Sequence, residues 1–294
     1  MSAANMTPVG ARTRPGALGR LRQFPTITYI GLVLAVAAIA VGIIGPRVAP
    51  YPIEKMHVDA ILQGPSQQHL LGTDRLGRDV LSRLLAGSRV SISVGLLATL
   101  FAGVVGIALG LVAGFYGKWV DEVVMRVMDM LMAFPYIVLA MALVAVIGPG
   151  LSNIVLVIGI VRLPQFARLT RGAVLAVKEL EFITAARSVG ATSLRLVLRH
   201  VFPNVLAPIF VISSLSIATA INTEAALSFL GLGITPPMSS WGTMLADGRS
   251  NLRDAWWVAT FPGIVISLAS LGFNLLGDAV QDLLDPRIAK RTGR

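Results

Sequence analysis

The feature that most constrains this fold is a series of apolar segments, each close to the length that a membrane-spanning helix needs. A helix of about 20 apolar residues crosses the hydrocarbon core of a bilayer. Polar and turn-forming residues separate six such segments: 27–45, 90–117, 130–148, 151–172, 201–223 and 255–277. The pattern predicts an all-α, polytopic membrane protein with six transmembrane helices.

Charge and composition agree with that fold class and exclude others. Charged residues make up 14% of the chain, whereas soluble domains carry about 25%. The formal net charge is +10, but the basic residues lie in short clusters between the apolar segments. No nucleic-acid-binding signature accompanies them, so we expect no nucleic-acid partner. The chain has no cysteine, which excludes disulfides and thiolate metal sites.

Lys and Arg residues are distributed unequally between the two sides of the predicted spans. They are about twice as frequent on the N-terminal side, with or without Arg162. Because basic loops stay in the cytoplasm, we expect both termini to lie inside a bacterial cell membrane. The predicted organisation is a cytoplasmic tail (1–26), a first helix with an external segment (27–89), a transport core (90–285) with a cytoplasmic loop (172–203), and a second cytoplasmic tail (286–294).

The stretch "EFITAARSVGATSLRLVLRHVFPN", residues 181–204, lies in that cytoplasmic loop. Its periodicity predicts two short amphipathic helices separated by Gly190, with Thr192 or Ser193 as the cap of the second. The predicted apolar faces are Phe182, Ala185, Ala186 and Val189 in the first helix, and Leu194, Val197, Leu198 and Val201 in the second. Periodicity alone fits either a helix lying on the anionic membrane surface or a docking element for a cytoplasmic partner.

Other features predict packing rather than chemistry. Gly106, Gly110 and Gly114 recur at every fourth position of the second predicted span, where they let another helix approach closely. Arg126 and Asp129 are expected to form a local ion pair. The sequence contains no GxxxxGK[ST] loop, no HExxH pattern and no Ser/His/Asp set. We therefore predict no catalytic residue, bound cofactor or metal ligand in this chain.

Four positions of the 181–204 stretch match the spacing of a known pattern: Ala185, Ala186, Gly190 and Pro203. They resemble the cytoplasmic EAA loop of bacterial ATP-binding-cassette (ABC) importer permeases, which reads Glu-Ala-Ala, three residues, Gly, nine residues, and an apolar-x-Leu-Pro ending. Thr184 stands here in place of the pattern's Glu. The resemblance implies an ATPase-docking coupling loop that includes Glu181, Thr184, Ala185, Ala186, Arg187, Gly190 and Pro203.

Further segments resemble the second permease subunit of dipeptide/oligopeptide (and nickel) importers. They are "HLLGTDRLGRDVLSRLLAGSRVSISVG", "GFYGKWVDEVVMRVMD", "ARLTRG", "EAALSFLGLGITPP", "WGTMLADGR" and "NLLGDAVQDLLDPR", in this order within residues 64–287. The resemblance implies a type I ABC importer permease that moves di- or oligopeptides inward by alternating access. It also implies three kinds of partner: a homologous second permease subunit, two cytoplasmic ATPase subunits that bind ATP and Mg²⁺, and an external solute-binding protein.

Two alternatives stay open from the sequence. The same architecture could import nickel chelates or another small solute, because the motifs report coupling rather than ligand. An ion-coupled secondary transporter is the alternative of a different class. It predicts acidic residues deep in several spans and an internal inverted repeat, whereas this chain has few such acids and no evident repeat.

Candidate residues of the translocation path are Arg162, Met132 and Glu224. Arg162 lies roughly 16 Å into the fourth predicted span, where a charge must face water or a partner. We interpret it as a cavity residue that meets a peptide carboxylate, or alternatively as one that snorkels or pairs with an acid. Met132 fits an adaptable cavity wall or plain packing. Glu224 is expected at the outer end of the fifth span, as a gate or a contact for the binding protein. The loop 231–254 is expected on the same side, where the binding protein would dock.

Overall fold

The computed structural model describes residues 26–53 and 55–284, and helices make up most of this part of the chain. Five helices are long and apolar enough to cross a membrane: α2 (Thr26–Val48), α3 (Val80–Tyr116), α6 (Leu151–Lys178), the continuous helix of α8 (Ser193–Leu196) and α9 (Phe202–Phe229), and α11 (Trp257–Leu284). A bent pair, α4 (Lys118–Met132) and α5 (Tyr136–Ile147), makes a sixth candidate span. The predicted tails, apart from Thr26, lie outside the described residues.

The prediction of a straight third span at 130–148 is wrong, because α4 and α5 meet at an angle of 90°. The break lies at Pro135, which precedes α5. Proline has no N–H, its ring clashes with the preceding helical turn, and it disfavours helical geometry at the residue before it, here Phe134. We call this break, residues 133–135, the elbow. The predicted turn after the third span is present, since α5 ends at Gly148 with a φ of +94°.

The second span begins at Val80, earlier than the predicted start at residue 90. Asp79 caps this helix through Oδ2, which accepts a hydrogen bond from the Ser82 N–H at 2.8 Å. The first turns of α3 contain Arg83 and Arg89, and these two charges are the reason that a search for apolar residues did not include residues 80–89. α3 has 37 residues and is about 55 Å long, so it extends well beyond a hydrocarbon core of about 30 Å.

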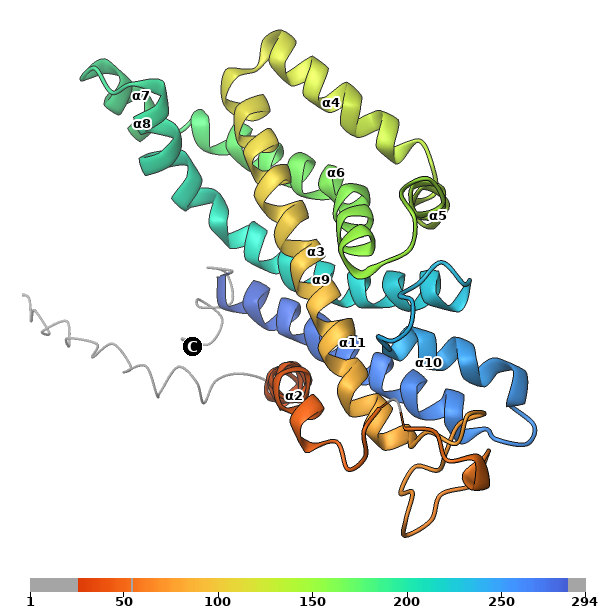
Figure 1. The fold of residues 1–294 in the computed structure, drawn as a ribbon. Coiled ribbons are helices and arrows are strands. Elements are labelled where there is room, and N and C mark those ends of the chain that lie inside the picture. The colour runs from red at the N-terminus through yellow and green to blue at the C-terminus, as the bar shows by residue number, and fades with distance from the viewer. Residues whose placement is uncertain (1–25, 54, 285–294) are drawn as a thin grey trace, which may run out of the picture.

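The helices form one bundle around α3, which packs most extensively on α6 and also contacts α2 and α9. α11 packs against α2, α9 and α10 (Trp241–Gly248). Close approach of α2 and α11 depends on glycine: a Cβ on Gly31 would lie 2.4 Å from that of Leu275. Figure 1 shows α7 (Glu181–Ser188) and α8 at one end of the bundle, and α10 with the 49–79 segment at the other. We call these the hairpin end and the α10 end.

Candidate functional site

The hairpin of α7 and α8 projects from the bundle (Figure 1). Two buried side chains hold it there. Ile183 and Leu196 are each 1% exposed. Ile183 packs with Val174 of α6 and with Val201 and Val205 at the start of the α9 helix. The hairpin is therefore fixed to two spans at once, while most of its remaining surface is open.

A glycine-dependent turn joins α7 to α8. Gly190 adopts a left-handed conformation with a φ of +85°, and its N–H donates to the carbonyl of Arg187 at 3.0 Å. The N–H of Ala191 donates to the carbonyl of Ala186 at 3.1 Å. These are the two bonds of a Schellman motif. Thr192 then caps α8, as predicted. A Cβ on Gly190 would have no atom within 4 Å, so the backbone conformation, not space within this chain, requires glycine.

The apolar faces predicted for this hairpin point largely away from the bundle. Their most exposed large members are Val189 (86%), Leu194 (67%), Leu198 (57%) and Phe182 (42%). Val201 of the predicted second face is buried, and the other buried side chains are Ile183 and Leu196, which lie off the predicted faces. The coupling-loop candidates Glu181, Thr184, Ala185 and Arg187 are also exposed, and Ala186 is partly so. The hairpin thus presents an open apolar surface edged by polar groups.

The second helix of the hairpin is not a separate element, in contrast to the sequence interpretation. α8 continues into α9 through one π-helical turn, Val197–Val201, in which the Phe202 N–H bonds to the Val197 carbonyl. Pro203 follows directly, and its missing N–H removes one helical bond there. Residues 172–178 of the predicted loop belong to α6. The predicted loop is therefore mostly rigid helix.

The glycine ridge lies on the contact between α3 and α6. A Cβ on Gly110 would lie 2.5 Å from the carbonyl oxygen of Ala167, and one on Gly114 would lie 2.8 Å from Val174 Cβ. Gly106 faces Phe166 in the same way, at 2.6 Å. Larger side chains at these positions would force the two helices apart.

Two ion pairs join α4 to α6. Arg171 donates to Asp121, with Nη2 and Oδ2 at 2.6 Å, and Arg168 pairs with Asp129. The expected pair of Arg126 and Asp129 is therefore wrong: the acid reaches across to the neighbouring helix instead. Cross-helix partners of this kind have no signature in local spacing.

The elbow borders a cavity of about 230 Å³, lined by Leu131, Met132, Phe134, Tyr136, Val161, Pro164 and Gln165. Met132 is a wall residue and is 49% exposed. Met128, by contrast, is 3% exposed and packs with Leu163 and Ala167. The methionines of α4 therefore divide between cavity wall and packing.

Arg162 lies in α6 beside the elbow and is 9% exposed. Its Nη1 donates to Gln165 Oε1 at 2.9 Å, and its guanidinium carbon lies 5.7 Å from the centroid of the Tyr136 ring. Within the described residues, none of the ion pairs involves Arg162.

Glu224 is a buried connector rather than a surface group. It is 0% exposed, and Oε1 accepts hydrogen bonds from Ser240 at 2.6 Å and Ser228 at 2.7 Å. Oε2 accepts one from Ser91 at 3.3 Å. Ser91 belongs to α3, Ser228 belongs to α9, and Ser240 is the N-cap of α10. The expected contact of Glu224 with the binding protein is therefore wrong, because α9 continues to Phe229 and α10 covers this side chain; its role as a gate stays a prediction.

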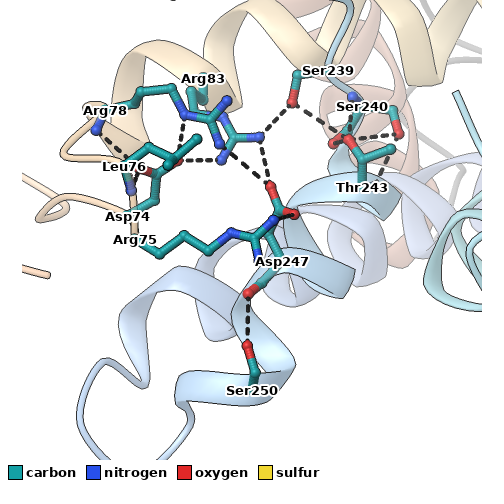
Figure 2. A network of polar contacts seen from close by, with 10 residues as sticks. All are labelled: Asp74, Arg75, Leu76, Arg78, Arg83, Ser239, Ser240, Thr243, Asp247 and Ser250. Carbon is teal, nitrogen blue, oxygen red and sulfur yellow. Dashed lines mark hydrogen bonds and ion pairs between the residues drawn. The ribbon is translucent and has the colours of Figure 1, made fainter. Parts of the chain in front are cut away.

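The α10 end contains a polar network that sequence reasoning missed (Figure 2). Asp74 is 0% exposed and accepts hydrogen bonds from two backbone N–H groups of its own turn, from Arg78 Nε at 2.7 Å and from Arg83 Nη1 at 2.5 Å. Arg83 Nη2 also donates to Asp247 and Ser239, both at 3.1 Å. The network ties the 49–79 segment to α10, and its partners lie too far apart in sequence for any local pattern to link them.

A larger cavity, of about 550 Å³, lies beside this network. One wall comes from the 49–79 segment, with Met56, Arg75 and Arg78, and the other from residues 231–247. The Arg75 side chain is 55% exposed and lies 3.4 Å from Asp247. This end of the bundle thus presents a recess with apolar walls and an edge at which arginines are paired with Asp247.

Together these features define a multi-pass α-helical membrane protein with an exposed helical hairpin between two spans. The fold is that of an ABC importer permease. It is similar to the inward-facing MetNI methionine ABC transporter with a TM-score of 0.56, covering 72% of this chain and 97% of that chain at 18% identity. At this identity the similarity establishes the fold alone.

Residues 106–290 match the family described as "Binding-protein-dependent transport system inner membrane component". The chain is 43% identical to a dipeptide transport system permease protein of Alkalihalophilus pseudofirmus, over 89% of this chain and 86% of that protein. It is 45% identical to a glutathione transport system permease protein of Pectobacterium atrosepticum, over 91% and 89%. It is 41% identical to a probable D,D-dipeptide transport system permease protein of Escherichia coli, over 89% and 88%. The chain belongs to this family of binding-protein-dependent ABC transport permeases.

Membership confirms the family resemblance and has direct consequences. The chain is a permease subunit and not an enzyme, and ATP hydrolysis belongs to a separate subunit. It works with ATPase and solute-binding partners. The alternative of an ion-coupled secondary transporter is therefore wrong.

Proposed function

We propose that this chain is one permease subunit of a peptide importer. Three relatives at 41–45% identity are named as permeases for dipeptides, glutathione or D,D-dipeptides, which favours small peptides over nickel chelates. In this proposal the chain pairs with a homologous second permease subunit above two ATPase subunits, which bind ATP and Mg²⁺. An external binding protein delivers the peptide, and the bundle moves it inward by alternating access.

The observation that carries this proposal is the exposed apolar hairpin on rigid anchors. Open apolar surface of this kind marks an interaction site, and Val189 and Leu194 provide it beside the turn at Gly190. Ile183 holds the hairpin to α6 and to the α9 helix. An ATPase that moves the hairpin therefore moves two spans with it. Chemistry belongs to the ATPase, and this chain converts the motion into a change of access.

The proposal fixes the orientation in the membrane. A hairpin that meets cytoplasmic ATPases puts the hairpin end inside a bacterial cell and the α10 end outside. Both termini are then cytoplasmic, in keeping with the excess of Lys and Arg on that side. The recess of about 550 Å³ at the α10 end then faces the binding protein.

The test compares Gly190→Arg with Gly148→Arg in the reconstituted complex. Both glycines have positive φ, +85° and +94°, and a Cβ on either would have no atom within 4 Å. Gly148, with a ψ of 163°, lies in a region that is essentially limited to glycine, so strain in the control is at least as large, and a loss confined to Gly190→Arg reports on position. We expect Gly190→Arg to assemble but to lose peptide uptake and the stimulation of ATPase activity by the loaded binding protein. Gly148→Arg should retain both.

Equal behaviour of the two variants would contradict the docking role of the hairpin. Uptake of dialanine into proteoliposomes and release of phosphate are measured on the same preparations. Co-purification of the ATPase subunits with each variant shows whether docking itself is lost.

A further inference from the structure

Arg162 is an arginine near the middle of a membrane-spanning helix. It lies 11 residues from the first residue of α6 and 16 from the last, which corresponds to about 16 Å and 24 Å along the helix. Its side chain is directed to Gln165, one turn further along α6, and not to either end of the span. Snorkelling to the membrane surface therefore does not describe this residue.

The charge of Arg162 has incomplete compensation within the described chain. Its polar contacts are the Gln165 side-chain oxygen and the face of the Tyr136 ring. Neither is an anion, and the ion pairs found among residues 26–53 and 55–284 all involve other groups. A charge at this depth is costly unless an anion or water faces it. The site therefore has the chemistry to hold a carboxylate.

The elbow cavity lies next to this charge, although Arg162 itself is not one of the residues that line it. Gln165 and Tyr136, the two side chains that contact Arg162, both line the cavity of about 230 Å³. At about 30 Å³ per water molecule, this volume holds a carboxyl group with one small residue, but not a whole peptide. The remaining walls are apolar, with Met132, Phe134 and Val161 among them. Met132 and Phe134 are 49% and 59% exposed, so the cavity opens to the surface of the chain, and its side-chain polar groups are those of Gln165 and Tyr136.

We propose that Arg162, with Gln165 and Tyr136, binds the C-terminal carboxylate of the transported peptide at the elbow. The inference rests on the proposed function, peptide import, and adds the chemical group that the path recognises. A guanidinium binds a carboxylate through two parallel N–H···O bonds, and every peptide with a free C-terminus carries this group. Selection by carboxylate thus admits peptides of different side chains.

The test compares uptake of dialanine and dialanine amide by the complete transporter in proteoliposomes, with each peptide saturating the binding protein. Because the binding protein is the same throughout, a change in the ratio between variants reports on this chain. The wild type should favour dialanine by about tenfold or more, the value of one charged hydrogen-bonded contact. Arg162→Gln should reduce the ratio to about 1, and Arg168→Gln, an exposed arginine of the same helix, should keep it.

The result also separates two sources of the carboxylate. If the carboxylate that pairs with Arg162 belongs to the second permease subunit, Arg162→Gln lowers the thermal stability of the peptide-free complex. The ratio of dialanine uptake to dialanine amide uptake then stays at the wild-type value, which overturns the proposal. If the wild type takes up neither peptide, the proposed function fails first and the inference falls with it.

A second measurement leaves Arg162 intact and does not depend on the folding of a charge variant. A photoreactive residue replaces Phe134, which lines the cavity, is 59% exposed and is not one of the three proposed binding residues, and radiolabelled dialanine is supplied to the complete transporter. We expect a crosslink that excess dialanine abolishes and excess dialanine amide does not. No crosslink, or equal competition by both, overturns the proposal.

Discussion

Replacing Arg83 by methionine should destabilise the α10 end of the protein. Arg83 is 3% exposed and bonds to the buried Asp74 and to Asp247. Removing one partner of a buried ion pair costs about 3–5 kcal/mol. Asp74 would keep its bond from Arg78 Nε at 2.7 Å and two backbone N–H bonds, and the Asp247 side chain is 25% exposed. We therefore expect a smaller cost, about 2–3 kcal/mol.

The assay is thermal unfolding of the purified complex, followed by tryptophan fluorescence. Three of the four tryptophans, Trp241, Trp256 and Trp257, lie in or beside α10 and the start of α11, and Trp241 is 1% exposed. A cost of about 2–3 kcal/mol corresponds to a fall in Tm of roughly 5–10 °C. Arg75→Met is the matched control, since Arg75 reaches the same Asp247 with a side chain that is 55% exposed, and such pairs contribute about 0–1 kcal/mol. Equal shifts for the two variants would refute the claim that the buried network fixes this end.

Two further predictions concern helix packing and the coupling loop. Gly110→Leu should reduce the yield of monodisperse protein and lower its Tm, because a Cβ there would lie 2.5 Å from the carbonyl oxygen of Ala167. Gly172→Leu is the control, because a Cβ at this position of α6 would meet no atom within 4 Å, and it should change neither the yield nor the Tm. Size-exclusion chromatography compares the two variants, and similar losses would contradict the role of the glycine ridge. Thr184→Glu restores the carboxylate of the EAA pattern at an exposed position, so Tm should stay within about 1 °C of the wild type. Its uptake of dialanine per ATP hydrolysed should equal or exceed the wild-type value, and a lower ratio would show that Thr184 is itself adapted to its ATPase.

The sequence predicted the features that local patterns encode. Runs of apolar residues indicated the spans, and Gly190 with Thr192 indicated the turn of the hairpin. The spacing of Gly106, Gly110 and Gly114 predicted a close helix contact. Each of these depends on backbone conformation or on residue type within one or two helical turns. Local pattern is sufficient for them.

The remaining features depend on residues that are distant in sequence. The bond between Arg83 and Asp247 joins positions 164 residues apart, and that between Arg168 and Asp129 joins positions 39 apart. The buried position of Glu224 depends on Ser91 and Ser240, which other elements bring to it. Arg83 also concealed the first turns of α3 from a search for apolar residues, because its charge is paired with Asp74, which precedes the helix, and with Asp247 of α10. Apolarity alone therefore underestimates helix length wherever ion pairs are buried.

α6 connects the coupling hairpin to the candidate carboxylate site. From Arg162 to its end at Lys178 the helix extends about 24 Å, and the hairpin follows directly. Along this length α6 is joined to α3 by the glycine ridge and to α4 by the pairs of Arg171 and Arg168. Through these contacts we expect a displacement at the hairpin to move this part of α6 together with α3 and α4. Pro164 interrupts the backbone hydrogen bonding of α6 within one turn of Arg162, so bending there changes the elbow cavity while the packed segment stays rigid.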